Sequence, residues 1–430
     1  MNANIHPVCW RHSAHRASKA VILPCSRIRN RCKWLFLGAF VFSCFLFWWL
    51  RSILVRDLLH IVDTVTDETI GISILALLLF IAGYLLPANT RLADPRSYPM
   101  LDACAAFAYK ATQFFFFPAL LIAIQQLSRR IGVDYGLNDI IPRPYQALLY
   151  IHLFFGFMYL GGADAEKQGN RRLVIATILV ILPRLIISLH GARFFLAQAV
   201  VPALLIAVAR GWIRFSAKRI LQILALAIVI IVMPAVTRGD KVIGPEKDLI
   251  MITGNNILGL YQDNLDISLD SNCPPLLISL TAKTIPYGLL GICVVNFAGL
   301  KNMPATLERI ITNNDPYSFQ GTAAGAGSIY LLELYVTGGL FAVYIGSVLF
   351  GYSCRLFVSW IERRSLFAGI WAECLTRALL TPRGNIGYVF ERIPSLVLAT
   401  GLVIFLVWAG RLIKQANSAA LPLIALRSAG

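Results

Sequence analysis

Long apolar runs alternate with short polar connections along most of the chain. Several windows of about 20 residues are almost free of charge, which is enough for a helix to cross the hydrocarbon core of a bilayer. A helix is favoured there because every backbone N–H and C=O group bonds within its own segment. The pattern predicts an all-α, polytopic bundle of about ten membrane spans, at residues 34–50, 70–87, 103–124, 145–162, 173–189, 194–209, 220–236, 328–352, 366–380 and 394–410.

The composition agrees with a membrane protein and excludes an ordinary soluble domain. Hydrophobic residues make up 57% of the chain, charged residues 14%, and the mean hydropathy is +0.68, whereas soluble domains carry about 25% charged residues. No cleavable signal peptide is expected, since the first apolar run, 20–24, is too short. The cysteines are scattered without metal-ligand spacing, so we expect no metal, no cofactor and no disulfide framework, with Cys273 and Cys293 as the single conceivable pair.

The distribution of Lys and Arg predicts the orientation, because these residues resist translocation when they lie in short loops. Residues 1–33 carry seven basic residues and no acid, which places this tail in the cytoplasm. With ten alternating spans, the inner segments hold 22 basic residues and the short outer loops hold 8. We therefore expect spans within 34–236 and 328–410, a large periplasmic segment at 237–327, and a cytoplasmic tail at 411–430. This asymmetry and anionic membrane lipids account for the net charge of +17 without nucleic acid.

Residues 274–300 are apolar enough to form an eleventh span, which would invert every later segment. Inversion would move six basic residues outside and leave three inside, so the charge pattern favours ten spans. Lys283 and Pro286, near the middle of this stretch, suit instead a helix that lies on the membrane surface or re-enters it.

The later spans collect positive charge at their outer ends, where acids are scarce. An ionisable group within a membrane costs on the order of 3 kcal/mol and usually faces an interior cavity with a partner. Glu333 and Glu391 are the nearby acids counted, too few to pair every arginine. A guanidinium fork fits phosphate oxygens, so we expect a diphosphate ligand as the counter-ion, with lipid phosphates as the alternative for any single side chain. The arginines concerned are Arg184, Arg193, Arg377, Arg383 and Arg392.

Histidine and tyrosine add further candidates for a site in the outer half. His190, near Arg193, has the chemistry to accept a hydroxyl proton; taken alone it is better explained as an interface residue, and its neighbourhood favours the functional role. His152, inside a span, is explained by a hydrogen bond between helices. The outer segment contains GNNILGLYQDNLDISLDSNCPP, whose amides and carboxylates suit sugar hydroxyls, and Tyr261 there suits stacking on a sugar ring. The alternative for this stretch is a solvated loop.

Residues 319–340, FQGTAAGAGSIYLLELYVTGGL, are rich in glycine. A nucleotide-binding loop is excluded, because no Lys-Ser or Lys-Thr pair follows. Gly321 and Gly325 have the spacing that lets membrane helices approach closely. Glu333 is harder to explain by packing, since a carboxylate in an apolar helix needs an arginine, a substrate hydroxyl or a proton as its partner.

On these features the chain resembles the O-antigen or oligosaccharide repeat-unit polymerases, the Wzy-type family of bacterial inner membranes. The resemblance covers roughly 180–400 and rests on a Gly-x-Arg turn that opens an apolar helix (GARFFLAQAVVPALLIA), the large outer segment, the run GAGSIYLLELYVTGGL and the arginine of LTPRGN. It implies a GT-C-like, metal-independent glycosyltransferase that moves a growing chain from undecaprenyl diphosphate onto the next lipid-linked repeat unit. The implied partners are this lipid-linked oligosaccharide, a chain-length regulator and a flippase.

The resemblance also implies roles for individual residues. Arg193 and Arg383 would bind the diphosphate, whose negative charge develops as it leaves. Glu333 would act as a positioning or acidic group, Tyr335 would contact a sugar, and His190 would be the general base. The further substrate-binding residues come from the charge pattern and the polar outer segment, and are Arg184, Arg377, Arg392 and Tyr261.

Three other functions fit parts of the pattern. An O-antigen ligase has the same architecture and donor but uses the lipid A core as its acceptor. A lipid-linked oligosaccharide flippase or transporter would place its site near the midplane, often within repeated halves, and no such repeat is visible in this sequence. A structural scaffold would tolerate removal of the arginines.

Overall fold

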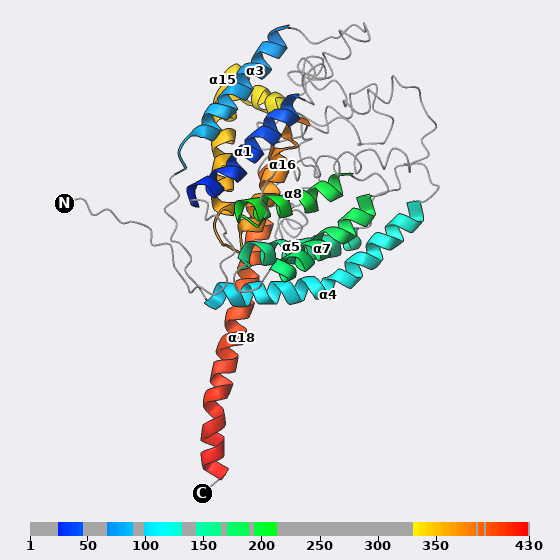
Figure 1. Ribbon diagram of the computed structural model, residues 1–430, viewed down its shortest axis with the longest axis vertical. Coiled ribbons are helices and arrows are strands. Elements are labelled where there is room, and N and C mark those ends of the chain that lie inside the picture. Colours follow the sequence, from blue (N-terminus) through cyan, green and yellow to red (C-terminus); the bar gives the residue numbers. More distant parts are fainter. Residues whose placement is uncertain are drawn as a thin grey trace, which may run out of the picture.

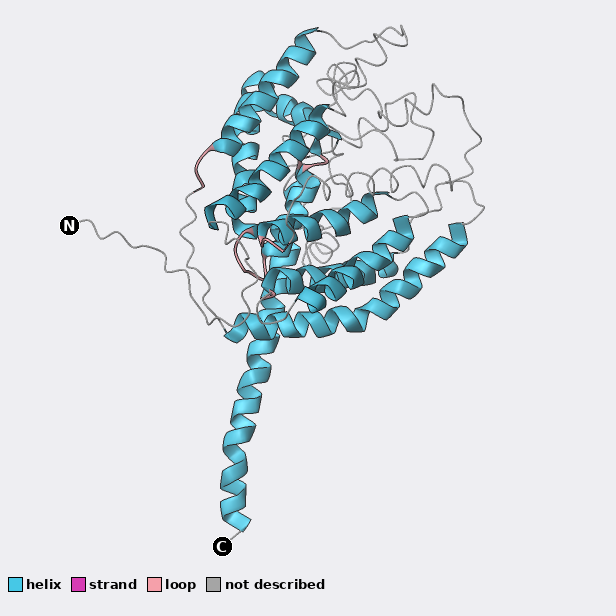
Figure 2. Ribbon diagram, in the orientation of Figure 1, coloured by secondary structure: helices cyan, strands magenta, loops and turns pink. Residues whose placement is uncertain are grey.

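The computed structural model describes residues 25–45, 67–88, 99–130, 143–164, 170–188, 193–212, 330–383, 386–390 and 393–428. Every regular element within these ranges is a helix, which confirms the all-α expectation for this part of the chain (Figures 1 and 2). The elements are α1 (Cys25–Cys44), α3 (Asp67–Leu85), α4 (Pro99–Arg130), α5 (Arg143–Gly162), α7 (Asn170–Ser188), α8 (Arg193–Ala209), α15 (Tyr330–Ile361), α16 (Ala368–Ala378), the 3-10 turn η3 (Thr381–Arg383), α17 (Gly387–Phe390) and α18 (Ile393–Ser428).

Several of these helices have the length and composition of membrane spans. Three are long and apolar enough to cross a bilayer, within Pro99–Ser128, Gly338–Ile361 and Ser395–Gln415. Four shorter helices, in α1, α3, α5 and α8, are also apolar. Large apolar side chains on the outer surface fit lipid contact: Phe114 of α4 is 74% exposed, as is Phe341 of α15. The described helices therefore have the character of a helical membrane protein.

The predicted spans between 70 and 209 coincide with α3, α4, α5, α7 and α8, with extra turns at both ends of α4. The first helix differs, because α1 begins at Cys25, inside the segment predicted as a basic tail. The span predicted at 220–236 and the possible re-entrant helix at 274–300 lie outside the described residues.

The prediction of one continuous span at 328–352 is wrong. The backbone of α15 breaks at Gly338 and Gly339, and Gly339 has φ 63° and ψ −157°, a conformation that suits glycine. Residues 330–337 fold back on the second part of the helix, so that the rings of Tyr330 and Phe350 lie 5.5 Å apart. In an unbroken helix these rings would be about 30 Å apart. We call residues 330–337 the fold-back segment.

The predicted span at 366–380 corresponds to α16, which is too short to cross a bilayer alone. Its 11 residues extend for about 16 Å, roughly half the hydrocarbon thickness. Nearly every residue of α16 is buried, because it lies in the centre of the bundle, against α8, α15 and α5 (Figure 1). Two elements of half length, α16 and the fold-back segment, thus replace two of the predicted spans.

Arginine side chains join several helix termini at one end of the bundle. Arg210, just after α8, donates from Nη2 to the carbonyl oxygen of Gly161 in α5, at 2.7 Å, and to that of Arg363, just after α15. Carbonyl groups in the last turn of a helix lack partners within it, and the bond to Gly161 supplies one of these partners. Burial and the neighbouring Arg364 lower the pKa of Arg210 to about 10, while Asp164 opposes the shift. The guanidinium stays charged at neutral pH.

A second arginine completes this junction. Arg364 donates from Nε to the carbonyl oxygen of Gly162 at 2.8 Å. Its guanidinium also pairs with Asp102 in the first turn of α4 and with Asp164 after α5, the latter at 3.6 Å. The start of α4 and the ends of α5, α8 and α15 therefore meet at what we call the arginine end. We call the other end of the bundle the opposite end.

The helices pack as two groups with α8 and α16 between them (Figure 1). In one group, α3 and α15 cross so closely that a Cβ on Gly351 would lie 2.1 Å from the carbonyl oxygen of Phe80. A Cβ on Gly83 would lie equally close to the carbonyl oxygen of Val348. Phe40 of α1 stacks on Phe80 with ring centroids 3.9 Å apart, which covers this crossing. The other group consists of α4, α5 and α7.

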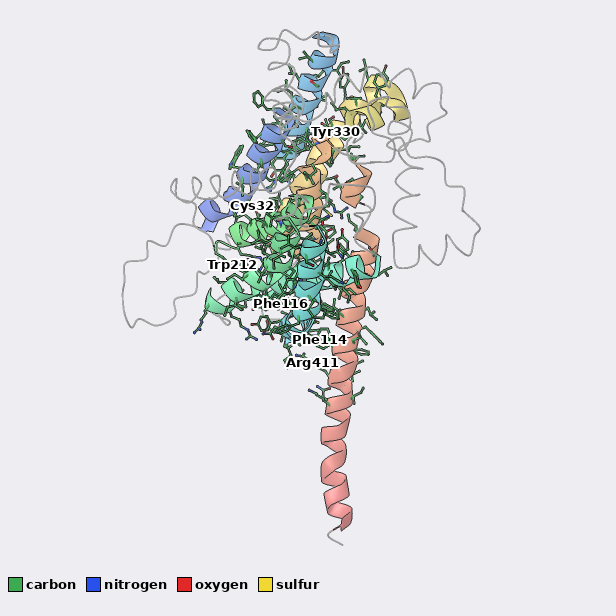
Figure 3. All side chains as sticks on the ribbon, turned by 90° about the vertical axis from the view of Figure 1, so that its right-hand side faces the viewer. Cys32, Phe114, Phe116, Trp212, Tyr330 and Arg411 are labelled. Carbon is green, nitrogen blue, oxygen red and sulfur yellow. The ribbon has the colours of Figure 1, made fainter. Side chains whose placement is uncertain are left out.

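The last helix extends beyond the bundle. α18 has 36 residues, about 54 Å of helix, and its C-terminal part runs away from the other helices (Figure 1). Arg411 of α18 donates to the carbonyl oxygen of Pro99 at 2.9 Å, which joins α18 to the start of α4 (Figure 3). Since α4 starts at the arginine end, α18 passes this end where it leaves the bundle.

Candidate functional site

Three elements that carry predicted site residues meet inside the bundle, at the level of the last turn of α16, which begins near the arginine end and extends about 16 Å from it. The hydroxyl of Ser43, near the end of α1, donates to the carbonyl oxygen of Leu379, just after α16, at 2.6 Å. Tyr330, the first residue of α15, and Phe40 of α1 both pack against the ring of Phe350, with centroids 5.5 and 6.2 Å away. The turn η3 follows α16 and contacts α15. The end of α1 thus borders both the fold-back segment and the end of α16.

Four predicted site residues belong to these elements. Glu333 and Tyr335 lie in the fold-back segment, Arg377 in the last turn of α16, and Arg383 at the end of η3. The structure describes the side chains of Tyr335, which is partly buried, and of Arg377. For Glu333 and Arg383 it describes the backbone alone. Residues that are distant in the sequence therefore share one region of the fold.

Arg377 has an acidic partner within its own helix. Its Nε and Nη2 atoms donate to Oε1 of Glu373, at 3.2 and 3.1 Å. Both side chains are buried, with 4% of Arg377 and 7% of Glu373 exposed. Arg377 therefore has an acidic partner that was not among the acids counted from the sequence. A buried guanidinium bonded in this way is held in one orientation at the end of α16.

Glu373 itself was missed by the sequence analysis, which counted Glu333 and Glu391 as the nearby acids. The signal was present, since Glu373 precedes Arg377 by one helical turn, the spacing at which opposite charges meet on a helix. Glu373 also borders a small cavity of about 10 Å³, lined by Phe154, Phe157, Met158, Leu366, Gly369, Ile370 and Leu396. This volume is close to the minimum that holds one water molecule.

Arg184 lies deep between α7 and α5. The side chain is 1% exposed, and its guanidinium carbon lies 4.8 Å from the ring centroid of Tyr150. His152, on the same helix as Tyr150, is equally buried and within electrostatic reach of Arg184. Its Nε2 atom makes no hydrogen bond to any of the described residues. An arginine over an aromatic face is stabilised by a cation–π contact, so Arg184 has a packing role as well as its charge.

Arg184 and Arg193 belong to the same half of the molecule as Arg377. α7 starts near the arginine end, where the guanidinium of Arg172 lies 4.4 Å from the ring centroid of Tyr109 in α4. Arg184, about one turn before the end of α7, is therefore towards the opposite end. α8 runs back from Arg193, its first residue, to the arginine end, and of Arg193 the backbone is described.

The remaining predicted site residues lie outside the described part of the chain. They are the general-base candidate His190, the substrate-binding candidates Arg392 and Tyr261, and the acid Glu391. The cysteine pair considered above, Cys273 and Cys293, is also outside it.

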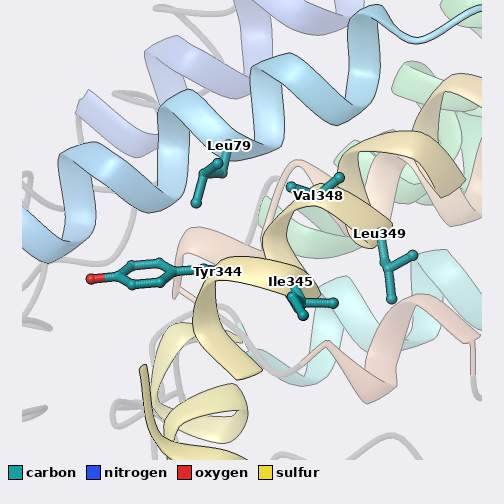
Figure 4. A pocket seen from close by; sticks show the side chains of 5 residues that line it. All are labelled: Leu79, Tyr344, Ile345, Val348 and Leu349. Carbon is teal, nitrogen blue, oxygen red and sulfur yellow. The ribbon is translucent and has the colours of Figure 1, made fainter. Parts of the chain in front are cut away.

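An apolar groove of about 240 Å³ lies between α3 and α15 (Figure 4). Its lining residues are Leu79, Tyr344, Ile345, Val348 and Leu349, of which Ile345 and Leu349 are also exposed. Tyr344 is less than two turns from the break at Gly338 and Gly339. An open, almost wholly apolar groove in a membrane helix pair is suited to hydrocarbon chains.

Metal ligation has no support in the part of the chain that the structure describes. No group of three or more His, Cys, Asp or Glu side chains there is arranged to hold a metal ion. The described cysteines, Cys32, Cys44, Cys104, Cys354 and Cys374, are buried and unpaired. The chemistry available from the described side chains is that of guanidinium, carboxylate, imidazole and phenol groups.

The chain was compared with family models, with curated proteins and with solved structures, and nothing matches. Any function must therefore be argued from the residues and their arrangement.

Proposed function

We propose that this protein polymerises undecaprenyl-diphosphate-linked oligosaccharide repeat units at the periplasmic face of a bacterial inner membrane. The observation that carries the proposal is the meeting of α16, η3 and the fold-back segment at the end of α1. These elements bear Arg377, Arg383, Glu333 and Tyr335. Irregular backbone at membrane depth is tolerated where it is buried in protein or lines a cavity, so such places often form substrate sites.

The proposed reaction is a glycosyl transfer. A hydroxyl oxygen of the incoming repeat unit attacks the anomeric carbon of the growing chain, and the bond from that carbon to the diphosphate oxygen breaks. The undecaprenyl diphosphate leaves with the electron pair, and the hydroxyl proton passes to a base. Arg383 and Arg193 stabilise the leaving charge, while Arg377, fixed by Glu373, supplies a third oriented cation. The apolar groove beside the break in α15 suits the polyprenyl chain.

The test is to replace the two arginines assigned to the diphosphate. We expect Arg383→Ala and Arg193→Ala each to reduce formation of long glycan chains by about a hundredfold, the typical cost of losing one oriented donor to a developing negative charge. The assay is a gel of surface glycan from cells that express each variant, with protein abundance measured in the membrane fraction. Lys414→Ala, an exposed position on α18, is the matched control and leaves the ladder unchanged. Normal ladders from both arginine variants would contradict the proposal.

The same assay separates the polymerase from an O-antigen ligase. Loss of a polymerase leaves a single repeat unit on the surface glycan, whereas loss of a ligase leaves long chains attached to the lipid carrier. We expect the first result. Long chains on the carrier would assign the protein to the ligase reaction instead.

A flippase for lipid-linked oligosaccharides is the second candidate, because the break at Gly338 and Gly339 is of the kind found in transporters. Purified protein distinguishes the two. A polymerase extends a lipid-linked repeat unit in detergent solution, where there are no two compartments, whereas a flippase shows no reaction there and moves the lipid across vesicles.

A further inference from the structure

Two basic side chains lie together where α1, α3 and α15 approach one another, near the arginine end. Arg355 is in the last two turns of α15, and Lys33 is in α1. The hydroxyl of Tyr84, at the end of α3, donates to the carbonyl oxygen of Lys33 at 2.8 Å, which fixes Lys33 beside α3. Arg355 lies one turn after Gly351, whose Cβ would lie 3.0 Å from the backbone nitrogen of the same Tyr84. The packing of the helices therefore brings two like charges to the end of α3, which costs free energy unless an anion joins them.

Two of the three guanidinium nitrogens of Arg355 lack acceptors in the described part of the chain. Its Nε and Nη1 atoms are buried, and among the described residues neither has a hydrogen-bond partner. A buried donor left without an acceptor costs about 1–3 kcal/mol, and more when it is charged. Glu362 also acts on Lys33, but one carboxylate leaves the two cations with a net positive charge. An additional acceptor of negative charge is therefore the missing component here.

The position of this cluster indicates the depth at which its ligand lies. Trp34, next to Lys33, is 56% exposed, and the ammonium of Lys33 lies 5.4 Å from the centroid of its ring. Tryptophan side chains are enriched at the level of the lipid headgroups. Leu35 and the apolar remainder of α1 follow directly. The two cations thus lie at the border between apolar helix and polar surroundings, where lipid phosphates are found.

We propose that Arg355 and Lys33 bind the phosphate of an anionic phospholipid. The guanidinium of Arg355 provides donors that match phosphate oxygens, and the ammonium of Lys33 provides a second charge at the same place. The headgroup joins the start of α1 to the ends of α3 and α15, so its binding stabilises the folded protein. This site is distinct from the region where α16, η3 and the fold-back segment meet, and does not depend on the proposed glycosyl transfer.

The experiment measures thermal unfolding of the purified full-length protein in detergent. Short-chain phosphatidylglycerol, short-chain phosphatidylcholine and inorganic phosphate are titrated separately. A ligand that binds only the folded state raises the midpoint temperature of unfolding as the ligand concentration increases. We expect phosphatidylglycerol to raise it at concentrations where the other two do not. Arg355→Gln and Lys33→Gln should each weaken the apparent affinity about tenfold, corresponding to the loss of one charged contact.

Lys414→Gln is the matched control, since Lys414 is an exposed basic residue on α18 outside the cluster. An equal loss of affinity in this variant would mean a general effect of surface charge and would overturn the site. Equal stabilisation by phosphatidylcholine would remove the requirement for an anionic headgroup, and equal stabilisation by inorganic phosphate would show a site for the free anion. If Arg355→Gln does not fold, Lys33→Gln decides the matter, because Lys33 is not buried.

Discussion

The Glu373–Arg377 pair allows packing and chemistry to be separated by mutation. Replacing Glu373 with Gln leaves a guanidinium that is 4% exposed without its counter-charge. Removing one partner of a buried ion pair costs about 3–5 kcal/mol, because the other charge stays buried and uncompensated. Arg377→Met should cost less than Glu373→Gln, since a buried carboxylate can take up a proton and become neutral, whereas a guanidinium stays charged.

The double variant Glu373→Leu/Arg377→Met provides the decisive comparison. Replacing both members of a buried pair with apolar residues of similar size is often neutral or stabilising. We therefore expect the free energy of unfolding of the double variant to lie within about 1 kcal/mol of the wild-type value. With the single variants Glu373→Leu and Arg377→Met, the double variant closes a double-mutant cycle, whose coupling free energy should be at least about 3 kcal/mol in magnitude. The assay is thermal unfolding in detergent, followed by the intrinsic fluorescence of tryptophan, with the amount of folded protein checked by gel filtration.

This variant also tests the role of Arg377 in the proposed reaction. If Arg377 helps to bind the diphosphate, the stable double variant will be inserted normally and still fail to make long glycan chains. A stable variant with a normal ladder would limit the pair to packing. The reasoning about burial would be refuted if the free energies of unfolding of both single variants lay within about 1 kcal/mol of the wild-type value.

Three further predictions concern stability and are measured by the same unfolding assay. Gly351→Ala should cost about 1–3 kcal/mol, because the new Cβ would force α3 and α15 apart, whereas Gly401→Ala, with nothing within 4 Å, should not destabilise; equal effects would contradict the close crossing. Gly339→Ala should cost about 1–3 kcal/mol through backbone strain alone, since its Cβ meets open space; an unchanged midpoint would contradict the observed φ. Arg364→Gln should lower the free energy of unfolding by about 1 kcal/mol, because it removes the hydrogen bond to the carbonyl oxygen of Gly162 and the ion pairs with Asp102 and Asp164. Adding Asp102→Asn should then cost little more; a full additional loss would exclude the ion pair with Asp102 as a cause.

Most of the helices could be predicted from the sequence, because an apolar run of about 20 residues has few alternatives in a bilayer. The ranges of α5, α7 and α8 follow from hydropathy to within a few residues. The break in α15 could not be predicted in this way. Both halves are apolar, and hydropathy averaged over a window carries no information on a change in chain direction. The pair Gly338 and Gly339 was the local signal, because a left-handed backbone position is the natural use of such a glycine.

The candidate site was predictable in part. The charge pattern singled out Arg184 and Arg377 among the many arginines, and both are buried. It failed on Glu373, because acids were sought near the predicted span ends and not one turn earlier on the same helix. Contacts between segments that are distant in sequence, such as Ser43 with Leu379, carry no sequence signal at all. Hydropathy and charge therefore gave the residues but not their partners.

The glycine-mediated crossing of α3 and α15 has a mechanical consequence. Backbone touches backbone there, with no layer of side chains that could change rotamer and let the helices slide. The two helices therefore shift as a single rigid body whenever the protein changes shape. Entry of a bulky ligand between the helices would require this body to move relative to α4, α5 and α7, and the contacts of α8 and α16 with the two groups would have to change.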